Sequence, residues 1–588
     1  MNMDQHYITL RKHFESIKDN EEFPIKMEQL EVVLSCTRRN AQILVKRMAE
    51  EGYIVWKAGR GRGNQSTMLF IQPLDELIFE KAKRLAVDEK LTDAWKLVDH
   101  FTGAKIEFAN WLHKHLGFIE SVDEDTLRFP FYRTVPDLDP TFVHRRSEAH
   151  LVNQLFNKLV KFADGKLTPD LAHFWESYDE DSVWRFYLRK GVKFHHGRTL
   201  TSKDVEYTFL RSMKYGHYDL MRDTIMEIKP VGKYTIDFIL KESNALFADF
   251  LCSERYSIVP FELEQINLTR PFSALPIGTG PFRIKKNTDS ILQLEAHDEY
   301  FGGRPWLDRI EMWVWPNYHR LEHKGQMRED DLYFGGFPAE EPSFNQIQNL
   351  EQGAVYLTFN LNKSGPTKNV YFRSAVHHAL DREKIMGLGG AKEAPACSFF
   401  TDYSQKCFQS DFDRVRAKEL LAMSDYKGES LHLYTYVMPS NEQNARWIKE
   451  QLGLLGINIE VTILPISELS NPVVLARADF VVAGEVLGIQ EDIDLIEMFN
   501  FRNGFIYNHL GDAEMELVQE CLSLCKRESS SQVRKSHLSS LLENLTQEQK
   551  LIFLYHSKQT VQHSKSLSGI IMNGWGNVDY QNIWIKRD

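Results

Sequence analysis

The segment Trp184–Val205 reads WRFYLRKGVKFHHGRTLTSKDV and carries the strongest structural signal in this chain of 588 residues. Its first five residues alternate as in a half-buried strand. Gly191 and Gly197 favour turns because glycine adopts left-handed backbone at no steric cost. Thr201 or Ser202 can accept hydrogen bonds from the first turn of a helix. The segment therefore predicts a strand, two turns and a capped helix.

The sequence around this segment has the same character. From about residue 125 to the end, short apolar strands alternate with helices, which is typical of an α/β fold. This stretch is too long for one compact lobe, and we expect two. With 43% hydrophobic residues and ordinary glycine and proline usage, collagenous, coiled-coil and broadly disordered classes are excluded.

The net charge of the chain is −11, which excludes a generally basic protein that coats nucleic acid but allows a local basic patch. The first ten residues lack the pattern of a secretory signal, and no apolar run is long enough to span a membrane. We therefore expect a cytoplasmic protein with no membrane partner. Six cysteines without a paired CxxC spacing predict no disulfide framework.

The N-terminal region has helix-turn-helix spacing. A short helical pattern over Lys26–Leu34 is followed by a break at Ser35-Cys36 and a second helix over Thr37–Glu51, which Gly52 ends. In the second helix an apolar stripe recurs at helical spacing, formed by Ala41, Leu44, Val45 and Met48.

The opposite face of this second helix is cationic and amide-bearing, as a DNA recognition helix requires. Arg39 can fork onto guanine and Gln42 onto adenine in the major groove. Arg38, Lys46 and Arg47 at its flanks can neutralise phosphates. A helix pair that docks another protein is the plainer alternative.

Two short strand patterns, 53–56 and 68–71, follow the helix and predict a wing. The loop between them holds Arg60 and Arg62 among three glycines, so its backbone can approach a phosphate ridge while the arginines supply charge. The spacing fits neither GxGxxG nor a P-loop. Residues 36–65 hold seven Lys or Arg against two Glu, so positive charge is concentrated here. We predict a DNA-binding domain over 1–72.

Residues 73–124 carry helical spacing with a break at Gly103 and predict a helical linker region. These helices either transmit a signal between the two ends of the protein or act as a plain spacer.

The quoted segment closely resembles the signature of the family 5 solute-binding proteins, which include peptide and nickel receptors of ABC importers. His196 departs from the family's usual Asp at a surface turn. Further matches follow in the family's order and extend over nearly all of 125–588, at 138–140, 276–282, 300–308, 359–362 and 371–382. This order places the first lobe at about 125–355 with 555–588, and the second at about 356–554.

The order of the parts resembles the SgrR-type bacterial transcriptional regulators over the whole chain. The resemblance implies a multidomain protein: an all-α/winged-helix N-terminal domain, then an α/β two-lobed domain like the class II periplasmic binding proteins of family 5. It also implies a ligand-responsive regulator that binds promoter DNA and a small metabolite, in that family linked to sugar phosphate. A homodimer on DNA is compatible with this interpretation. A transport receptor for peptides or metal is the alternative.

Five residues are candidates for the ligand cleft. Arg145 and Arg146, with Glu148, follow the first strand of the α/β region, where the two arginines can clamp an anion bidentately. A solvated or interdomain ion pair with Glu148 is the alternative. Trp315 can stack on a ligand or belong to the core, and Asn360 can bond a ligand or its neighbouring backbone.

Enzymatic chemistry finds no support in the sequence. It contains no GxSxG elbow, HExxH motif or Walker loop. The adjacent pairs His195-His196 and His377-His378 seldom chelate one metal unaided. Cys521 and Cys525 lack a cluster that would complete a four-ligand set. We expect no catalytic residues, metal or cofactor.

Overall fold

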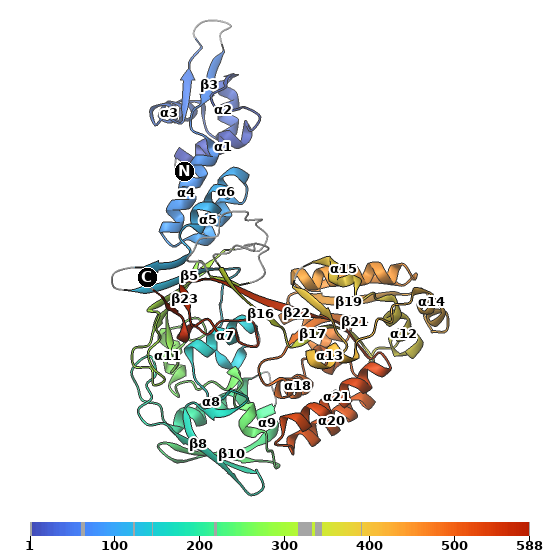
Figure 1. Ribbon diagram of the computed structural model, residues 1–588. Helices are drawn as coiled ribbons and strands as arrows, with labels where there is room; N and C mark the ends of the chain where they lie inside the picture. The colour runs from blue at the N-terminus through green and yellow to red at the C-terminus, as the bar shows by residue number, and fades with distance from the viewer. Residues whose placement is uncertain are drawn as a thin grey trace.

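The computed structural model describes residues 3–59, 65–120, 124–143, 145–216, 220–315, 332–334, 344–389 and 391–586. Figure 1 shows an N-terminal part that projects from a body of two lobes. Within the described ranges no helix has the length and apolar character that crossing a membrane requires.

The N-terminal part is a winged helix. Three antiparallel strands form a sheet in the order β1-β3-β2, over Glu22–Ile25, Ser66–Phe70 and Ile54–Lys57. Three helices pack on it: α1 (Met3–His13), α2 (Met27–Val33) and α3 (Arg38–Glu50). The predicted break between α2 and α3 is confirmed, since Ser35 has a φ of 48°, and Gly52 ends α3 with a φ of 83°. The strand β1 and the helix α1 were not predicted.

A bundle of three helices follows: α4 (Leu74–Val87), α5 (Leu91–Val98) and α6 (Thr102–His113). The predicted break at Gly103 is wrong, because Gly103 lies in the first turn of α6. A Cβ atom at this position would lie 2.3 Å from an Asp75 carboxylate oxygen. The glycine therefore allows α6 to approach α4 closely, which explains why it stands inside a helix.

The first lobe contains two main sheets. One has the order β12-β13-β14-β5-β4, over Phe282–Asn287, Ile291–Ala296, Arg309–Val314, Asp125–Phe131 and Gly117–Glu120. The other has the order β10-β11-β9-β8, over Ile225–Gly232, Thr235–Leu240, Val183–Leu188 and Ala172–Tyr178. A small hairpin pairs β6 (Val160–Ala163) with β7 (Lys166–Pro169), and the lobe's helices are α7 (Arg146–Leu155), α8 (Ser202–Tyr215), α9 (Leu220–Thr224), α10 (Phe247–Phe250) and α11 (Leu263–Thr269).

The segment Trp184–Val205 folds as predicted. It forms β9, turns at two glycines with positive φ, and then enters α8. Thr201 caps α8 in a capping box with Asp204. Asp204 is fully buried and accepts hydrogen bonds from the backbone N–H of Thr201 at 2.8 Å and of Phe261 at 3.0 Å. The signature is therefore architectural, as its local spacing indicated.

The second lobe is built on an eight-stranded sheet with the main order β15-β22-β17-β21-β19-β20. Its strands are β15 (Leu332–Phe334), β16 (Phe344–Leu350), β17 (Gly353–Phe359), β18 (Lys392–Pro395), β19 (Ser430–Tyr436), β20 (Asn458–Leu464), β21 (Phe480–Val486) and β22 (Leu551–Ser564). The predicted lobe limits at 355 and 555 fall inside β17 and β22.

Two groups of helices accompany this sheet. The first contributes to a core that is separate from that of the first lobe: α12 (Val370–Ala379), α14 (Arg414–Ala422) and α15 (Pro439–Gly453). The second shares its core with the first lobe: α18 (Glu491–Asn500), α20 (Asp512–Lys526) and α21 (Ser531–Gln547). Figure 1 shows this second group along the lower side of the second lobe, next to the first lobe.

The structure gives a bonding state for five of the cysteines. Cys36, Cys252, Cys521 and Cys525 are free. Cys397, however, is disulfide-bonded, which the sequence did not indicate.

Candidate functional site

The exposed face of α3 carries the predicted DNA contacts. Its apolar stripe is buried in the winged-helix core, so the opposite side faces solvent. All five predicted residues of this helix are exposed: Arg38, Arg39, Gln42, Lys46 and Arg47.

Three of these five side chains form ion pairs with neighbouring glutamates, and the other two form none with the described residues. Arg38 lies 2.7 Å from Glu28, Lys46 lies 3.6 Å from Glu50, and Arg47 lies 3.4 Å from Glu51. Such exposed pairs contribute little to stability and break easily. Within the described residues, Arg39 and Gln42 have no hydrogen bond or ion pair, so they are free to bind other groups.

The wing strands β2 and β3 are confirmed, whereas Arg60 and Arg62 lie outside the described residues. At the base of the wing, Lys57 pairs with Glu22 at 2.8 Å. The backbone N–H of Gly59 donates to the Ser66 hydroxyl at 3.1 Å.

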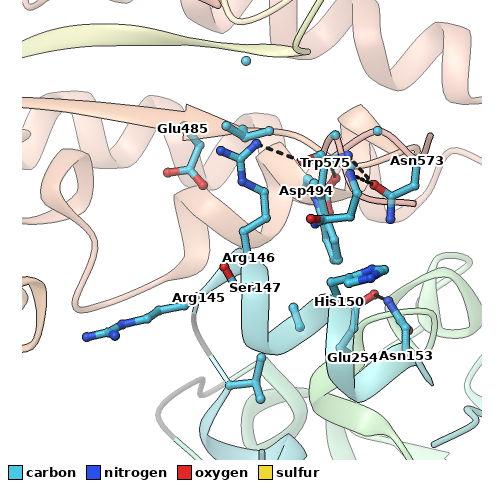
Figure 2. A pocket seen from close by; sticks show the side chains of 18 of the residues that line it. Arg145, Arg146, Ser147, His150, Asn153, Glu254, Glu485, Asp494, Asn573 and Trp575 are labelled. Atoms are coloured by element: carbon cyan, nitrogen blue, oxygen red, sulfur yellow. Dashed lines mark hydrogen bonds between the residues drawn. The ribbon is translucent and has the colours of Figure 1, made fainter. Parts of the chain in front are cut away.

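The main cavity has a volume of about 1760 Å³ and is lined by both lobes. The first lobe contributes α7, the second contributes β21 and α18, and a segment over 573–581 closes one side. Figure 2 shows α7 facing Glu485, Asp494, Asn573 and Trp575. A site between two lobes is where a bound ligand can contact both.

Arg145 and Arg146 both line this cavity, but they differ in their surroundings. Arg145 is exposed at the start of α7. The Arg146 guanidinium crosses to the second lobe, where it pairs with the buried Glu351 and donates to the Trp575 carbonyl at 3.0 Å. The charge of Arg146 is therefore already balanced, and a free two-arginine anion clamp does not exist here.

Glu148 does not line the cavity. It is buried and forms a two-pronged ion pair with Arg133, both N–O distances being 2.7 Å. This pair raises the pKa of Arg133 and fixes the start of α7 against the segment after β5. The alternative, an ion pair of Arg145 or Arg146 with Glu148, is wrong, because Glu148 pairs with Arg133 and Arg146 pairs with Glu351.

Trp315 is not a cleft residue. It is fully buried among the linker helices, and its ring stacks on that of Trp95 in α5 at 4.8 Å. Its backbone N–H donates to the Phe131 carbonyl at 2.7 Å, and Phe131 lines the cavity. The sequence placed Trp315 at the end of a strand, but it did not indicate that the linker helices before the first lobe would cover the Trp315 ring.

Asn360 is also misassigned to the cleft. It is buried, its amide donates to the Ala478 carbonyl at 2.9 Å, and its side-chain oxygen accepts from the backbone N–H of Asn362 and Lys363. The Asn360 side chain therefore bonds backbone groups of the segments after β17 and before β21, which was the alternative interpretation.

A group of carboxylates that the sequence did not predict also lines the cavity. Burial raises the pKa of Asp249 to about 6 and of Glu485 to about 7, and it also raises the pKa of Asp494 and Glu497. One signal was available, because Glu485 interrupts an otherwise apolar strand, FVVAGEV.

Three buried polar side chains of the cavity wall have an atom without a hydrogen-bond partner. These atoms are Nε2 of His150, Oε1 of Gln154 and Nδ2 of Asn441. Burial lowers the pKa of His150 to about 4, so the imidazole is neutral near pH 7. Unpartnered buried polar groups are rare in proteins, and these three atoms are sealed from solvent behind the cavity wall.

We searched the described residues for side chains that could bind a metal ion. No group of three or more His, Cys, Asp or Glu side chains is placed to hold a metal ion among these residues.

The fold and the cavity define a two-lobed solute-binding domain joined to an N-terminal winged helix. Two family models match the chain in that order. "Sugar transport-related sRNA regulator N-term" matches residues 2–120, and "Bacterial extracellular solute-binding proteins, family 5 Middle" matches 166–504. The chain belongs to the family 5 solute-binding proteins and, with its N-terminal domain, to the SgrR-type regulators.

Similar proteins support this assignment along the whole chain. An uncharacterized protein of Bacillus subtilis, YhjP, is 30% identical and covers 100% of both chains. The HTH-type transcriptional regulator SgrR of Shigella dysenteriae is 27% identical over 95% of this chain and 94% of its own. The characterised relative named here is a regulator, and the family model over residues 166–504 is that of solute-binding proteins rather than of enzymes.

Solved structures match the two-lobed body. The oligopeptide-binding protein AppA of Bacillus subtilis, in complex with a nonapeptide, has a TM-score of 0.66 at 22% identity, over 79% of this chain and 99% of AppA. A dipeptide-binding protein of Pseudoalteromonas, in complex with Met-Leu, has a TM-score of 0.68 at 19% identity, over 78% of this chain and all of its own. At these identities the likeness shows the fold alone.

Proposed function

We propose that this protein is a transcriptional regulator that binds promoter DNA through α3 and its wing and responds to a small molecule bound between the two lobes. The observation that carries this proposal is one chain with an exposed cationic recognition face and a cavity of about 1760 Å³ lined by both lobes.

The DNA-binding half rests on the chemistry of α3. The free guanidinium of Arg39 and the free amide of Gln42 suit the donor and acceptor pattern of the major groove. Arg38, Lys46 and Arg47 suit the phosphates, and the exposed carboxylates beside them are weak competitors for a polyanion.

The sensing half rests on the position of the cavity. A ligand favours a closed arrangement of the lobes only through contacts that differ between the open and closed states. The lining side chains of α7 and of β21 belong to different lobes, so a ligand between them makes contacts of this kind. Arg145, at the start of α7, remains a proposed first-lobe contact, whereas Arg146 would contact a ligand only while also paired with Glu351.

The linker helices connect the two halves. The ring of Trp95 in α5 stacks on Trp315, which follows β14 of the first lobe. In the same region the Thr92 hydroxyl donates to the Asp289 carbonyl, and Lys286 pairs with Glu89. These contacts anchor the linker to the first lobe and favour a role in signal transmission over that of a plain spacer.

The test is DNA binding by the full chain, measured by selecting sequences from random duplexes and determining their affinities by fluorescence anisotropy. We expect one preferred sequence class, which Arg39→Ala loses and the exposed control Arg416→Ala on α14 keeps. A compound that raises the melting temperature should then change DNA affinity. If the chain binds no duplex DNA, the transport-receptor alternative takes its place.

A further inference from the structure

One apolar side chain interrupts the polar face of α3. Ile43 is 49% exposed. The other large apolar residues of this helix are buried in the winged-helix core: Leu44, Val45 and Met48. Ile43 belongs neither to this core nor to the partly buried side chains that pack against it. Packing within the domain therefore does not explain why an isoleucine stands at this position.

Ile43 lies in the middle of the surface that carries the proposed DNA contacts. It follows Arg39 by four residues and precedes Lys46 by three, so the three side chains are neighbours along one line of the helix. Gln42 precedes it directly, and all four residues are exposed. Ile43 is thus surrounded by groups that suit bases and phosphates.

The rest of the chain contacts the winged helix through other elements. Figure 1 shows α3 far from the two lobes, near the end of the projecting N-terminal part. The linker is attached on the side of α1, where Asp4 pairs with Lys81 of α4 at 2.9 Å, and Leu77 of α4 packs on the winged-helix core. About half of the Ile43 side chain thus remains open to a molecule from outside the chain.

The major groove of DNA contains an apolar group that matches this side chain. Thymine presents its C5-methyl group there, next to the donors and acceptors of the base edges. An isoleucine cannot bond those donors and acceptors, but it can pack on the methyl group. Because a β-branched side chain in a helix keeps mainly one χ1 rotamer, Ile43 offers a fixed apolar surface and loses little side-chain entropy on contact.

We propose that Ile43 packs against a thymine methyl group in the major groove and thereby selects thymine at one position of the operator. This inference rests on the proposed DNA-binding function and adds a specificity-determining residue to Arg39 and Gln42. Successive residues of a helix point about 100° apart, so Gln42 and Ile43 should contact neighbouring base pairs. The operator should then hold the selected thymine beside the base that Gln42 reads.

A contact between two copies of this chain would be a different use of the same apolar side chain. The cations around Ile43 argue against it, because Arg39, Lys46 and Arg47 would face their own counterparts across such a contact. Like charges placed together at an interface oppose association. The same cations favour a polyanion, which leaves duplex DNA as the occupant that satisfies both the charge and the apolar group.

The experiment uses the full chain and the duplex selected from random sequences. Each thymine of the preferred sequence is replaced in turn by deoxyuridine, which removes the methyl group and keeps base pairing unchanged. Fluorescence anisotropy measures the affinities of the native chain, of Ile43→Ala, and of the control Ile106→Ala. Ile106 lies on α6 of the linker and is 54% exposed, so the control removes the same side chain at similar exposure.

We expect one position at which deoxyuridine weakens binding by the native chain and by the control about fourfold, the effect of one buried methyl-sized group. Ile43→Ala should bind the thymine duplex at least as weakly as the native chain binds the deoxyuridine duplex, and it should not distinguish the two bases at that position. Ile43→Val keeps a β-branched apolar side chain and should retain part of the discrimination. A merely structural role of Ile43 would lower both affinities and leave their ratio unchanged.

The inference is overturned if no deoxyuridine substitution weakens binding by the native chain, or if Ile43→Ala keeps the native discrimination at every thymine. It is also overturned if Ile43→Ala converts a dimer of the DNA-free protein to monomers in sedimentation experiments, because the side chain would then lie between two copies. Failure of the proposed function gives a different result. A native chain that binds no duplex DNA would refute the regulator, whereas sequence-specific binding that ignores the methyl groups would refute only the role of Ile43.

Discussion

Arg39→Ala should relax the base preference of the winged helix while leaving the protein folded. The Arg39 side chain is exposed on α3 and has no partner among the described residues, so its removal sacrifices no internal contact. A lost base contact costs about 1 to 3 kcal/mol, which corresponds to a loss of about 5-fold to 150-fold in affinity for the preferred sequence. Affinity for random DNA should fall far less, because one phosphate-like charge is a minor part of nonspecific binding.

The assay is fluorescence anisotropy with the selected duplex and a scrambled duplex, at several salt concentrations. The ratio of the two affinities is the decisive quantity, and Lys46→Ala is the comparison. Lys46 already pairs with Glu50, and its loss should weaken both duplexes alike and reduce the salt slope by about one. Equal losses on both duplexes for Arg39→Ala would show that Arg39 contacts phosphate and that the assigned base-reading face is wrong.

Three further predictions test other parts of the chain. The double variant Arg60→Ala, Arg62→Ala should weaken specific and nonspecific DNA binding together, and unchanged footprints across salt concentrations would refute the wing assignment. Asp204→Ala should lower the free energy of unfolding by about 3 kcal/mol in urea titrations, because it removes the cap of α8 and the ion pair with Arg198. The control Asp298→Ala, which removes an exposed acid, should lower it by less than about 0.5 kcal/mol. Since the pKa of His150 is lowered to about 4, its contribution to stability is complete above pH 6.5 and is lost as the pH falls from about 6.5 to about 4. His150→Phe should flatten that part of the stability profile, and an unchanged slope would show that other groups cause it.

The fold could be predicted where local spacing decides it. The stripe from Ala41 to Met48 fixed which face of α3 is buried, and the turn at Ser35 followed from the interruption of the pattern. The strand and capped helix around Asp204 were equally local. The predicted helix break at Gly103 was wrong, because this glycine makes room for the Asp75 side chain of α4 and does not end a helix. Asp75 lies 28 positions earlier, so local spacing could not indicate the contact.

The cavity could be predicted only in outline, since its wall comes from distant segments. The position of Arg145 and Arg146 after the first strand located α7 at the cavity, but their pairing state depends on Glu351 and Trp575. Single acids such as Glu485 carry no motif. Their position in one cavity wall appears only when the fold brings distant segments together.

The joint at Trp315 imposes a thermodynamic symmetry on the regulator. One side of this residue meets the linker through Trp95, and its backbone N–H holds Phe131 at the cavity wall. Any free energy that passes through this joint passes in both directions. If an effector strengthens DNA binding by some factor, the promoter strengthens effector binding by the same factor, so promoter-bound molecules would respond at a lower effector concentration than free ones.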